Sequence, residues 1–271
     1  MIPASARMTI ATFFLIGSLA YSWPSPPDGY RWEMVRELSD EFNGSQLDSG
    51  KWAPNHPYWQ GRQPSRFSEA NVSVRDGKLE LRSTTMVKNL SDIKNPQQDI
   101  WVQAACVSSK APIASYGYYE VRMKASKLTV SSSFWMQGKY SEIDVAEQFG
   151  EPINRSWRRR YMLMDTHYFS GNPRSDHHVP ARSQMSTAAD DKYHIYGVWW
   201  KDKNSVVYFL DGKEVTRLTP AGAFLEPMYV FFDTEVFQEA GLPSVDSLND
   251  SRKNTMYVDW VHSWKLVPNK K

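Results

Sequence analysis

The chain is a succession of short segments in which apolar and polar residues alternate, the pattern of β-strands with one buried face. The clearest is 71–83, NVSVRDGKLELRS, where two alternating runs flank Asp76-Gly77. Asp-Gly is typical of two-residue hairpin turns, so this segment predicts a β-hairpin. In 116–126, YGYYEVRMKAS, one face carries Tyr, Val and Met while the other carries Glu, Arg and Lys.

Three further segments extend this pattern, at 193–215, 228–236 and 254–267, and the first contains an Asp-Gly turn. Helical periodicity is weak everywhere, and only 243–251, PSVDSLNDS, favours a short helical turn. Many short strands with frequent turns predict an all-β sandwich of two antiparallel sheets. A long concave sheet face could hold an extended ligand.

Composition supports a single domain. The chain has 271 residues, of which 41% are hydrophobic, and no linker or repeat interrupts residues 23–271. The net charge of +2 gives no reason to expect nucleic acid or an acidic membrane as a partner. The 11 tryptophans suggest both an aromatic core and surfaces that stack on sugar rings. Nothing indicates an oligomer, so we expect a monomer.

The N-terminus has the pattern of a secretory signal. Arg7 precedes the apolar run Met8–Ala20, and small residues, Ala20 and Ser22, stand where a signal peptidase cuts. The run is short for a membrane span, so an uncleaved anchor is the weaker alternative. We expect residues 1–22 to be removed and the mature chain to be secreted, extracellular or periplasmic.

The segment SEIDVAEQF places three carboxylates within six residues, Glu142, Asp144 and Glu147. In a regular strand Glu142 and Asp144 share a face, whereas Glu147 points the other way. A β-bulge around Val145-Ala146 would reset the alternation and bring all three to one face. Without it, the segment is a strand with ordinary exposed acids. The hexapeptide contains no Lys or Arg to pair with the acids, which favours a cleft.

Such a set of acids suits hydrolysis of a glycosidic bond. A retaining enzyme needs one carboxylate as nucleophile and one carboxyl group as proton donor, about 5–5.5 Å apart. A third carboxylate beside the nucleophile can share a proton with it.

EIDVAE, with Trp135 seven residues before its first acid, resembles the active-site strand of glycoside hydrolase family 16. The similarity continues in order through nearly all of the mature chain, at residues 37–52, 58–82, 116–125, 193–200 and 253–265. The W-x-G-R-x-P segment and the closing NTMYVDWVHSWK look most like the branch of β-agarases and β-porphyranases. The resemblance implies a concanavalin-like β-jelly roll with a concave cleft and retaining hydrolysis.

By motif position, the resemblance implies that Glu142 is the nucleophile, Glu147 the general acid/base and Asp144 the helper. Glu147 must start protonated, so we expect its pKa to be raised. No cofactor is required. The resemblance also implies a structural calcium ion away from the cleft, with Asp259 as a ligand.

Five residues are candidates for binding substrate, each with a structural alternative. Trp59 and Arg62 offer a stacking plane and a bidentate donor that could accept a sulfate ester, or they simply pin a surface loop. Trp135 lines the cleft or fills the core. His167 matches a cleft histidine of related enzymes or is a core histidine. Glu235 resembles a substrate-contacting Glu of agarases or is an exposed strand acid.

The most economical function is a secreted endo-hydrolase of β-linked red-algal galactan, with agarose preferred. The preference rests on Met136 and Gln137, which stand after Trp135 where an arginine would help bind sulfate. A porphyranase or carrageenan-type hydrolase is the alternative, because Arg62 and Arg158–Arg160 could meet sulfated sugar. A non-catalytic lectin on the same sandwich is a further alternative, disfavoured by the intact set of acids.

Overall fold

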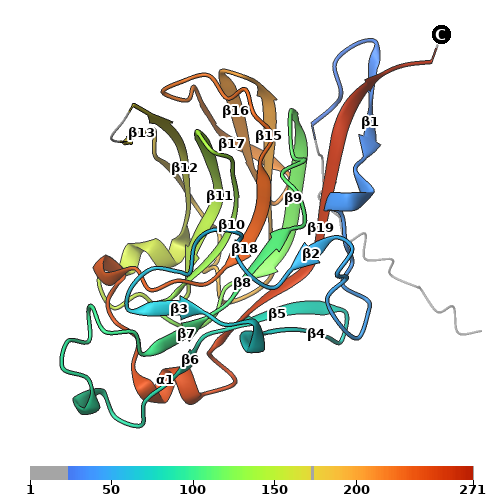
Figure 1. Cartoon of the computed structure of the whole chain (residues 1–271). Helices are drawn as coiled ribbons and strands as arrows, with labels where there is room; N and C mark the ends of the chain where they lie inside the picture. The colour runs from blue at the N-terminus through green and yellow to red at the C-terminus, as the bar shows by residue number, and fades with distance from the viewer. Residues whose placement is uncertain (1–23, 172–173, 271) are drawn as a thin grey trace, which may run out of the picture.

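In the computed structural model, which describes residues 24–171 and 174–270, the alternating segments form two large antiparallel sheets packed face to face (Figure 1). The predicted sandwich is confirmed. One sheet carries the three acids and is called the cleft sheet; the other is called the outer sheet. The predicted domain comprising residues 23–271 forms a single sandwich over its described part.

The outer sheet has the strand order β17-β16-β15-β9-β19-β5-β4, with β1 paired to β19. Its strands are β1 (Tyr30–Met34), β4 (Val72–Arg75), β5 (Lys78–Arg82), β9 (Gly117–Lys124), β15 (His194–Asp202), β16 (Ser205–Leu210), β17 (Lys213–Leu218) and β19 (Thr255–Pro268). The predicted hairpin joins β4 to β5. Asp76 and Gly77 both have positive φ, 51° and 67°, as a two-residue hairpin turn requires.

The cleft sheet has the order β13-β12-β11-β10-β18-β8-β2, with β14 also paired to β12. Its strands are β2 (Trp52–Ala53), β8 (Cys106–Ser109), β10 (Ser131–Gln137), β11 (Ser141–Phe149), β12 (Tyr161–Ser170), β13 (Ser175–His178), β14 (Ala181–Gln184) and β18 (Tyr229–Asp233).

A small third sheet and a few short helices lie at one end of the sandwich (Figure 1). The sheet contains β3 (Ser65–Phe67), β6 (Thr84–Thr85) and β7 (Val102–Ala104). The predicted helical turn is α1 (Val245–Asn249), capped by Ser244, whose hydroxyl accepts a hydrogen bond from the Ser247 amide. The 3-10 helices of the chain span Arg36–Leu38, Glu69–Asn71, Leu90–Asp92, Ser156–Arg160 and Gln238–Ala240.

The core fills the space between the two sheets. Tyr119, Val121 and Met123 of the outer sheet point into it, as their alternation predicts. From the cleft sheet, Phe134 stacks on Phe232 with ring centroids 5.3 Å apart. These buried apolar faces hold the sheets together and oblige the intervening residues of the cleft sheet to face outward.

Residues 1–22, expected to be a secretory signal, lie outside the described residues. Within the described ranges no helix has the length and apolar character needed to cross a bilayer.

Candidate active site

A bulge interrupts strand β11 between Asp144 and Glu147. On one side Asp144 pairs with Trp135 and Ala146 with Phe134, so Val145 is the extra residue. On the other side Asp144 opposes Asp165 and Glu147 opposes Leu163. Val145 and Ala146 are both buried in the core, which returns the next side chain to the outer face. The predicted bulge is confirmed.

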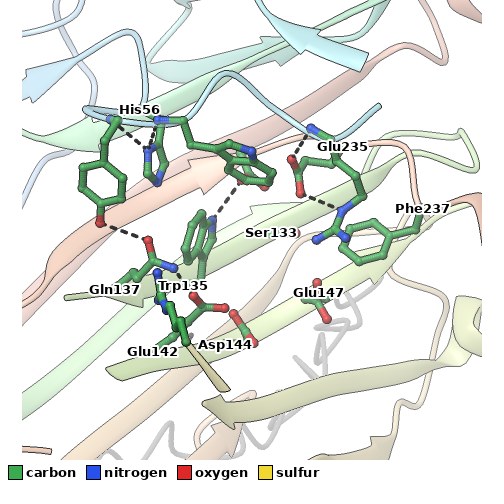
Figure 2. Close-up of a pocket in the computed structure, with 14 residues that line it drawn as sticks. His56, Ser133, Trp135, Gln137, Glu142, Asp144, Glu147, Glu235 and Phe237 are labelled. Atoms are coloured by element: carbon green, nitrogen blue, oxygen red, sulfur yellow. Dashed lines mark hydrogen bonds and ion pairs between the residues drawn. The ribbon is translucent and has the colours of Figure 1, made fainter. Parts of the chain in front are cut away.

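As a result, Glu142, Asp144 and Glu147 all line one pocket, with a cavity volume of about 350 Å³. Figure 2 shows the three carboxylates in a row along the strand. Without the bulge Glu147 would lie in the core, where an unpaired carboxylate is costly.

The environment of these acids favours their protonated forms. Burial raises the pKa of Glu147 to about 8, and the negative charge of Asp144 adds to the rise. Burial and Asp144 likewise raise the pKa of Glu142, while the charge of His167 and a hydrogen bond from the Gln137 amide oppose the rise. The expectation of a raised pKa at Glu147 therefore agrees with its surroundings.

His167 lies directly across from Glu142 on β12. Its Nε2 atom is 3.2 Å from Asp144 Oδ2 and 3.9 Å from Glu142 Oε1. Burial lowers the pKa of His167, but the hydrogen bond to Asp144 and the surrounding acids raise it to about 10. His167 therefore carries positive charge beside the acids, on the neighbouring strand, and is not among the residues that line the pocket.

Trp135 and Trp59 both line the pocket. Trp135 donates its indole N–H to Asp233 at 3.1 Å and stacks on Phe231 with centroids 4.4 Å apart. Trp59 packs edge-on against Phe67. Both rings are therefore fixed at the pocket by their neighbours, and the Trp135 side chain is largely buried.

Arg62 and Glu235 also reach the pocket, as a pair. The Arg62 backbone amide donates to Glu235 Oε1 at 3.1 Å, and the guanidinium Nε lies 3.4 Å from Oε2. The guanidinium also sits 4.3 Å above the centroid of the Phe237 ring. Glu235 is buried, whereas about half of the Arg62 side chain, 48%, is exposed. Arg62 thus keeps donors available to a ligand, and Glu235 orients it.

Several pocket residues were not anticipated: His56, Tyr58, Ser133, Gln137, Arg174, Asp233 and Phe237. Gln137 could have been found, because it shares the strand face of Trp135 and hydrogen-bonds Glu142. Ser133 follows the same alternation on β10, and Asp233 and Phe237 alternate with Glu235. His56, Tyr58 and Arg174 reach the pocket from other segments, and no local pattern marks them.

The expectation built on Met136 is wrong in its geometry. Met136 is fully buried and packs in the core between the sheets, because it alternates with Trp135 and Gln137. An arginine at this position could not reach a sugar, so Met136 carries no information on sulfate.

Asp259 does not fit as a calcium ligand. Its carboxylate accepts a hydrogen bond from the Arg122 guanidinium, which also lies 4.5 Å above the Tyr193 ring centroid. A cation would have to displace or approach this guanidinium.

In the described residues, two overlapping sets bring their potential metal-ligand atoms within 4.8 Å of one another: Glu142, Asp144 and His167, and Asp165, His167 and His178.

Comparison with known proteins identifies the family. The family model described as "Beta-porphyranase A-D, GH16 domain" matches residues 32–266. The chain belongs to glycoside hydrolase family 16. Enzymes of this family are glycoside hydrolases, so the prediction of an enzyme is confirmed, and the resemblance seen in the sequence is correct.

The similarity of this family 16 enzyme to individual relatives covers most of both chains. β-Porphyranase E of Zobellia galactanivorans is 34% identical over 261 residues, covering 89% of this chain and 91% of the relative. β-Porphyranase B of Phocaeicola plebeius is 32% identical, covering 90% and 88%.

Among solved structures, a β-porphyranase from the gut bacterium Bacteroides plebeius aligns with a TM-score of 0.81 at 32% identity, covering 91% of this chain and 96% of that one. β-Agarase A of Zobellia galactanivorans aligns with a TM-score of 0.80 at 21% identity, which shows a shared fold. The predicted jelly roll is confirmed.

Proposed function

We propose that this enzyme is a secreted, retaining endo-hydrolase of β-linked red-algal galactan, and that its substrate is porphyran rather than agarose. The observation that carries hydrolysis is the bulge in β11, which directs three carboxylates into one pocket. Support for porphyran comes from relatives: four β-porphyranases match at 31–34% identity and a fifth at 26%, whereas three agarases match at 28%. The initial preference for agarose depended partly on Met136, which faces the core.

In the proposed mechanism, Glu142 attacks the anomeric carbon as the bond to the glycosidic oxygen breaks. Glu147 donates its proton to the departing oxygen, which its raised pKa allows it to hold at neutral pH. A water molecule, deprotonated by Glu147, then attacks the same carbon and releases Glu142. The configuration is retained because two displacements occur.

Asp144 and His167 prepare Glu142 for this attack. The Asp144 carboxyl lies beside Glu142 and can take up its proton, while the positive charge of His167, 3.9 Å from Glu142 Oε1, favours the ionised nucleophile. Trp135 forms a platform for the sugar beside Glu142.

Arg62 and Arg174 support a sulfated substrate. Both guanidinium groups line the pocket, and Arg62 is fixed by Glu235 while remaining about half exposed. A guanidinium donates two parallel hydrogen bonds to an oxyanion such as a sulfate ester. Agarose, which has no sulfate, would offer these donors only neutral hydroxyl and ether oxygens.

The direct test is product analysis on porphyran, agarose, carrageenan and laminarin side by side, with wild type and Glu142→Gln. We expect oligosaccharides chiefly from porphyran, released by the wild type alone. Equal release by both proteins would refute the catalytic assignment. Binding of polysaccharide without any release would favour the lectin alternative, and faster cleavage of agarose would refute the choice of substrate.

Secretion as a monomer is part of the proposal. N-terminal sequencing of protein from the culture medium should give a start near Trp23, and light scattering should give a monomer mass. Retention of residues 1–22 on the cell would instead indicate an anchor.

A further inference from the structure

Strands β12 and β13 carry a cluster of side chains that could bind a metal ion, next to the three acids. Of this cluster, only His167 has a role in the mechanism above. His167 and His178 are directly opposite each other in the antiparallel β12–β13 pair. Their rings are nearly parallel, with centroids 5.4 Å apart. Asp165 precedes His167 by two residues on β12 and therefore shares its face. Three ligand-type side chains thus project from one face of two paired strands.

The atoms of this cluster converge. His178 Nδ1 lies 2.9 Å from Asp165 Oδ2, and His167 Nε2 lies 3.6 Å from the same oxygen. All three ligand atoms lie within 4.8 Å of one another. Around a tetrahedral Zn²⁺ with ligand bonds of about 2.0–2.2 Å, ligand atoms stand roughly 3.4 Å apart. The two observed distances, 2.9 and 3.6 Å, lie on either side of this value. Small side-chain rotations would therefore let all three atoms bind one ion.

A second observation points the same way. Asp176 lies within hydrogen-bond distance of His167 Nδ1, with both carboxylate oxygens at 2.9 Å. A proton on Nδ1 leaves Nε2 directed at the cluster. A carboxylate that orients the far nitrogen of a histidine in this way is the usual outer support of a metal-bound imidazole.

The surrounding charge also favours a cation. The carboxylates of Glu142, Asp144, Asp165 and Asp176 all lie within 4 Å of the His167 ring nitrogens. A divalent cation at the cluster would reduce this concentration of negative charge. Two imidazole nitrogens and one carboxylate oxygen suit zinc-like transition metals, whereas calcium prefers oxygen ligands throughout.

We propose that His167 Nε2, His178 Nδ1 and one oxygen of Asp165 form a binding site for a divalent transition-metal ion of the zinc class, oriented by Asp176. Asp144 Oδ2 is 3.2 Å from the same His167 Nε2, so a bound ion competes with Asp144 for this nitrogen. The ion takes the place of the Nε2 proton, which passes to solvent, and separates this nitrogen from Asp144. Asp144 then loses the contact that holds it beside Glu142, so the site is inhibitory. The inhibition rests on the proposed function, whereas the binding does not.

The test of binding is calorimetric titration of the full-length mature enzyme with Zn²⁺, together with the visible absorption spectrum of bound Co²⁺. His178→Gln removes one ligand but keeps a side chain that can hydrogen-bond Asp165, and it leaves hydrolysis without metal unchanged. The matched control is His177→Gln, one residue away on the opposite face of β13, where the native ring bonds Ser170.

We expect one Zn²⁺ per chain, a tetrahedral Co²⁺ spectrum, affinity at least about tenfold weaker in His178→Gln, and no change in His177→Gln. Equal affinity in wild type and His178→Gln, or an equal loss in both variants, would overturn the site. The absence of any Zn²⁺ binding to the folded wild type would overturn it as well.

The inhibitory role is tested separately by hydrolysis in the presence of Zn²⁺, with Ca²⁺ as the comparison ion. Zn²⁺ should inhibit wild type and His177→Gln, and the concentration needed should rise at least about tenfold in His178→Gln. Zn²⁺ that binds without inhibiting would refute the inhibitory role alone. An enzyme that binds Zn²⁺ but hydrolyses none of the polysaccharides would refute the proposed function and leave the metal site standing.

Discussion

Two glutamates five residues apart differ because of what surrounds each of them. Glu147 is held among Asp144, Glu235 and Arg62, and burial dominates, so its pKa rises to about 8. Glu142 receives a hydrogen bond from Gln137 and lies near the charged ring of His167. Burial and the charge of Asp144 raise the pKa of Glu142 as well, and the contacts with Gln137 and His167 oppose that rise, as ionisation of a nucleophile requires.

The pH dependence of hydrolysis should report the proton on Glu147. Because the acid must be protonated when the substrate bond breaks, kcat/KM should fall as pH rises through about 8. Glu147→Gln should lower kcat by roughly 10²- to 10⁴-fold and abolish this limb. The measurement is a pH–rate profile of both proteins, with the exposed ion-pair residue Glu41→Gln as control. An unchanged limb in Glu147→Gln would assign the proton elsewhere.

The guanidinium of Arg62 should distinguish sulfated from neutral galactan. Arg62→Ala should lower kcat/KM on porphyran roughly 10- to 100-fold, the value of a charged hydrogen-bonding contact, and lower it less on agarose. Arg62→Lys keeps the charge but loses the paired donors, so its activity should fall between the two. Thermal melting must accompany the kinetics, because Glu235 is buried and loses its ion pair with the guanidinium, although the backbone amide of residue 62 still donates to it. An equal loss on both polysaccharides would mean that Arg62 only positions Glu235.

At the scale of elements, strand β11 performs two tasks. Its inward residues, including the consecutive pair Val145 and Ala146, fill the core, while its outward acids form the pocket. The strand ends at Phe149. At the next residue, Gly150, an added Cβ would lie 1.9 Å from the Ser126 carbonyl oxygen and 2.9 Å from Asp190 Cβ. The chain at the end of β11 is therefore packed directly against another backbone segment.

Gly150→Ala should destabilise the fold by at least about 3 kcal/mol, because backbone atoms cannot move aside as a flexible side chain can. Gly77→Ala is the matched control. Its φ is positive, but its new Cβ would meet only the Asn43 side chain, at 3.2 Å, so about 1–2 kcal/mol is expected. Urea denaturation gives both values, and similar small losses would show that the contact at Gly150 relaxes.

At the scale of the whole molecule, folding of the sandwich buries several ionisable side chains and shifts their pKa values. Burial raises the pKa of Glu120 in the outer sheet to about 8, and that of Glu147 in the cleft sheet likewise. His56 shows the opposite effect, since burial lowers its pKa to about 4. Stability should therefore depend on pH.

The folded and unfolded chains bind different numbers of protons, and this difference sets how stability changes with pH. The folded chain keeps protons on Glu120 and Glu147 up to about pH 8, whereas the unfolded chain loses them near 4.5. His167 remains protonated to about pH 10 when folded, against 6.5 when unfolded. The folded state thus binds more protons through this range, and its stability should fall as pH rises from mildly acidic to alkaline values.

The melting temperature, measured between pH 5 and pH 10 at constant ionic strength, checks this prediction. Below about pH 6.5, His56 acts in the opposite sense, so the fall in stability should be shallower there than above pH 6.5. Glu120→Gln, which retains an acceptor for the Tyr118 hydroxyl, should flatten the fall without affecting hydrolysis. A melting temperature that rises from pH 6 to pH 9 would contradict the prediction.

The sequence by itself determined the strands, the Asp76-Gly77 hairpin, the single sandwich and the three acids with their bulge. Each of these depends on short-range periodicity, which states which face a residue occupies. The preference for agarose had a weak basis in the sequence, because Met136 was judged by its closeness in sequence to Trp135, although alternation puts it in the core.

Only the tertiary structure decided what stands next to those acids. His56, Arg174 and Phe237 come from segments far apart in the chain, and no local pattern marks their meeting at one pocket. The same holds for His178, which faces His167 only because β13 folds back along β12. Alternation assigns a residue to a face, but strand pairing and sheet curvature choose its neighbours, and the chemistry of the site depends on those neighbours.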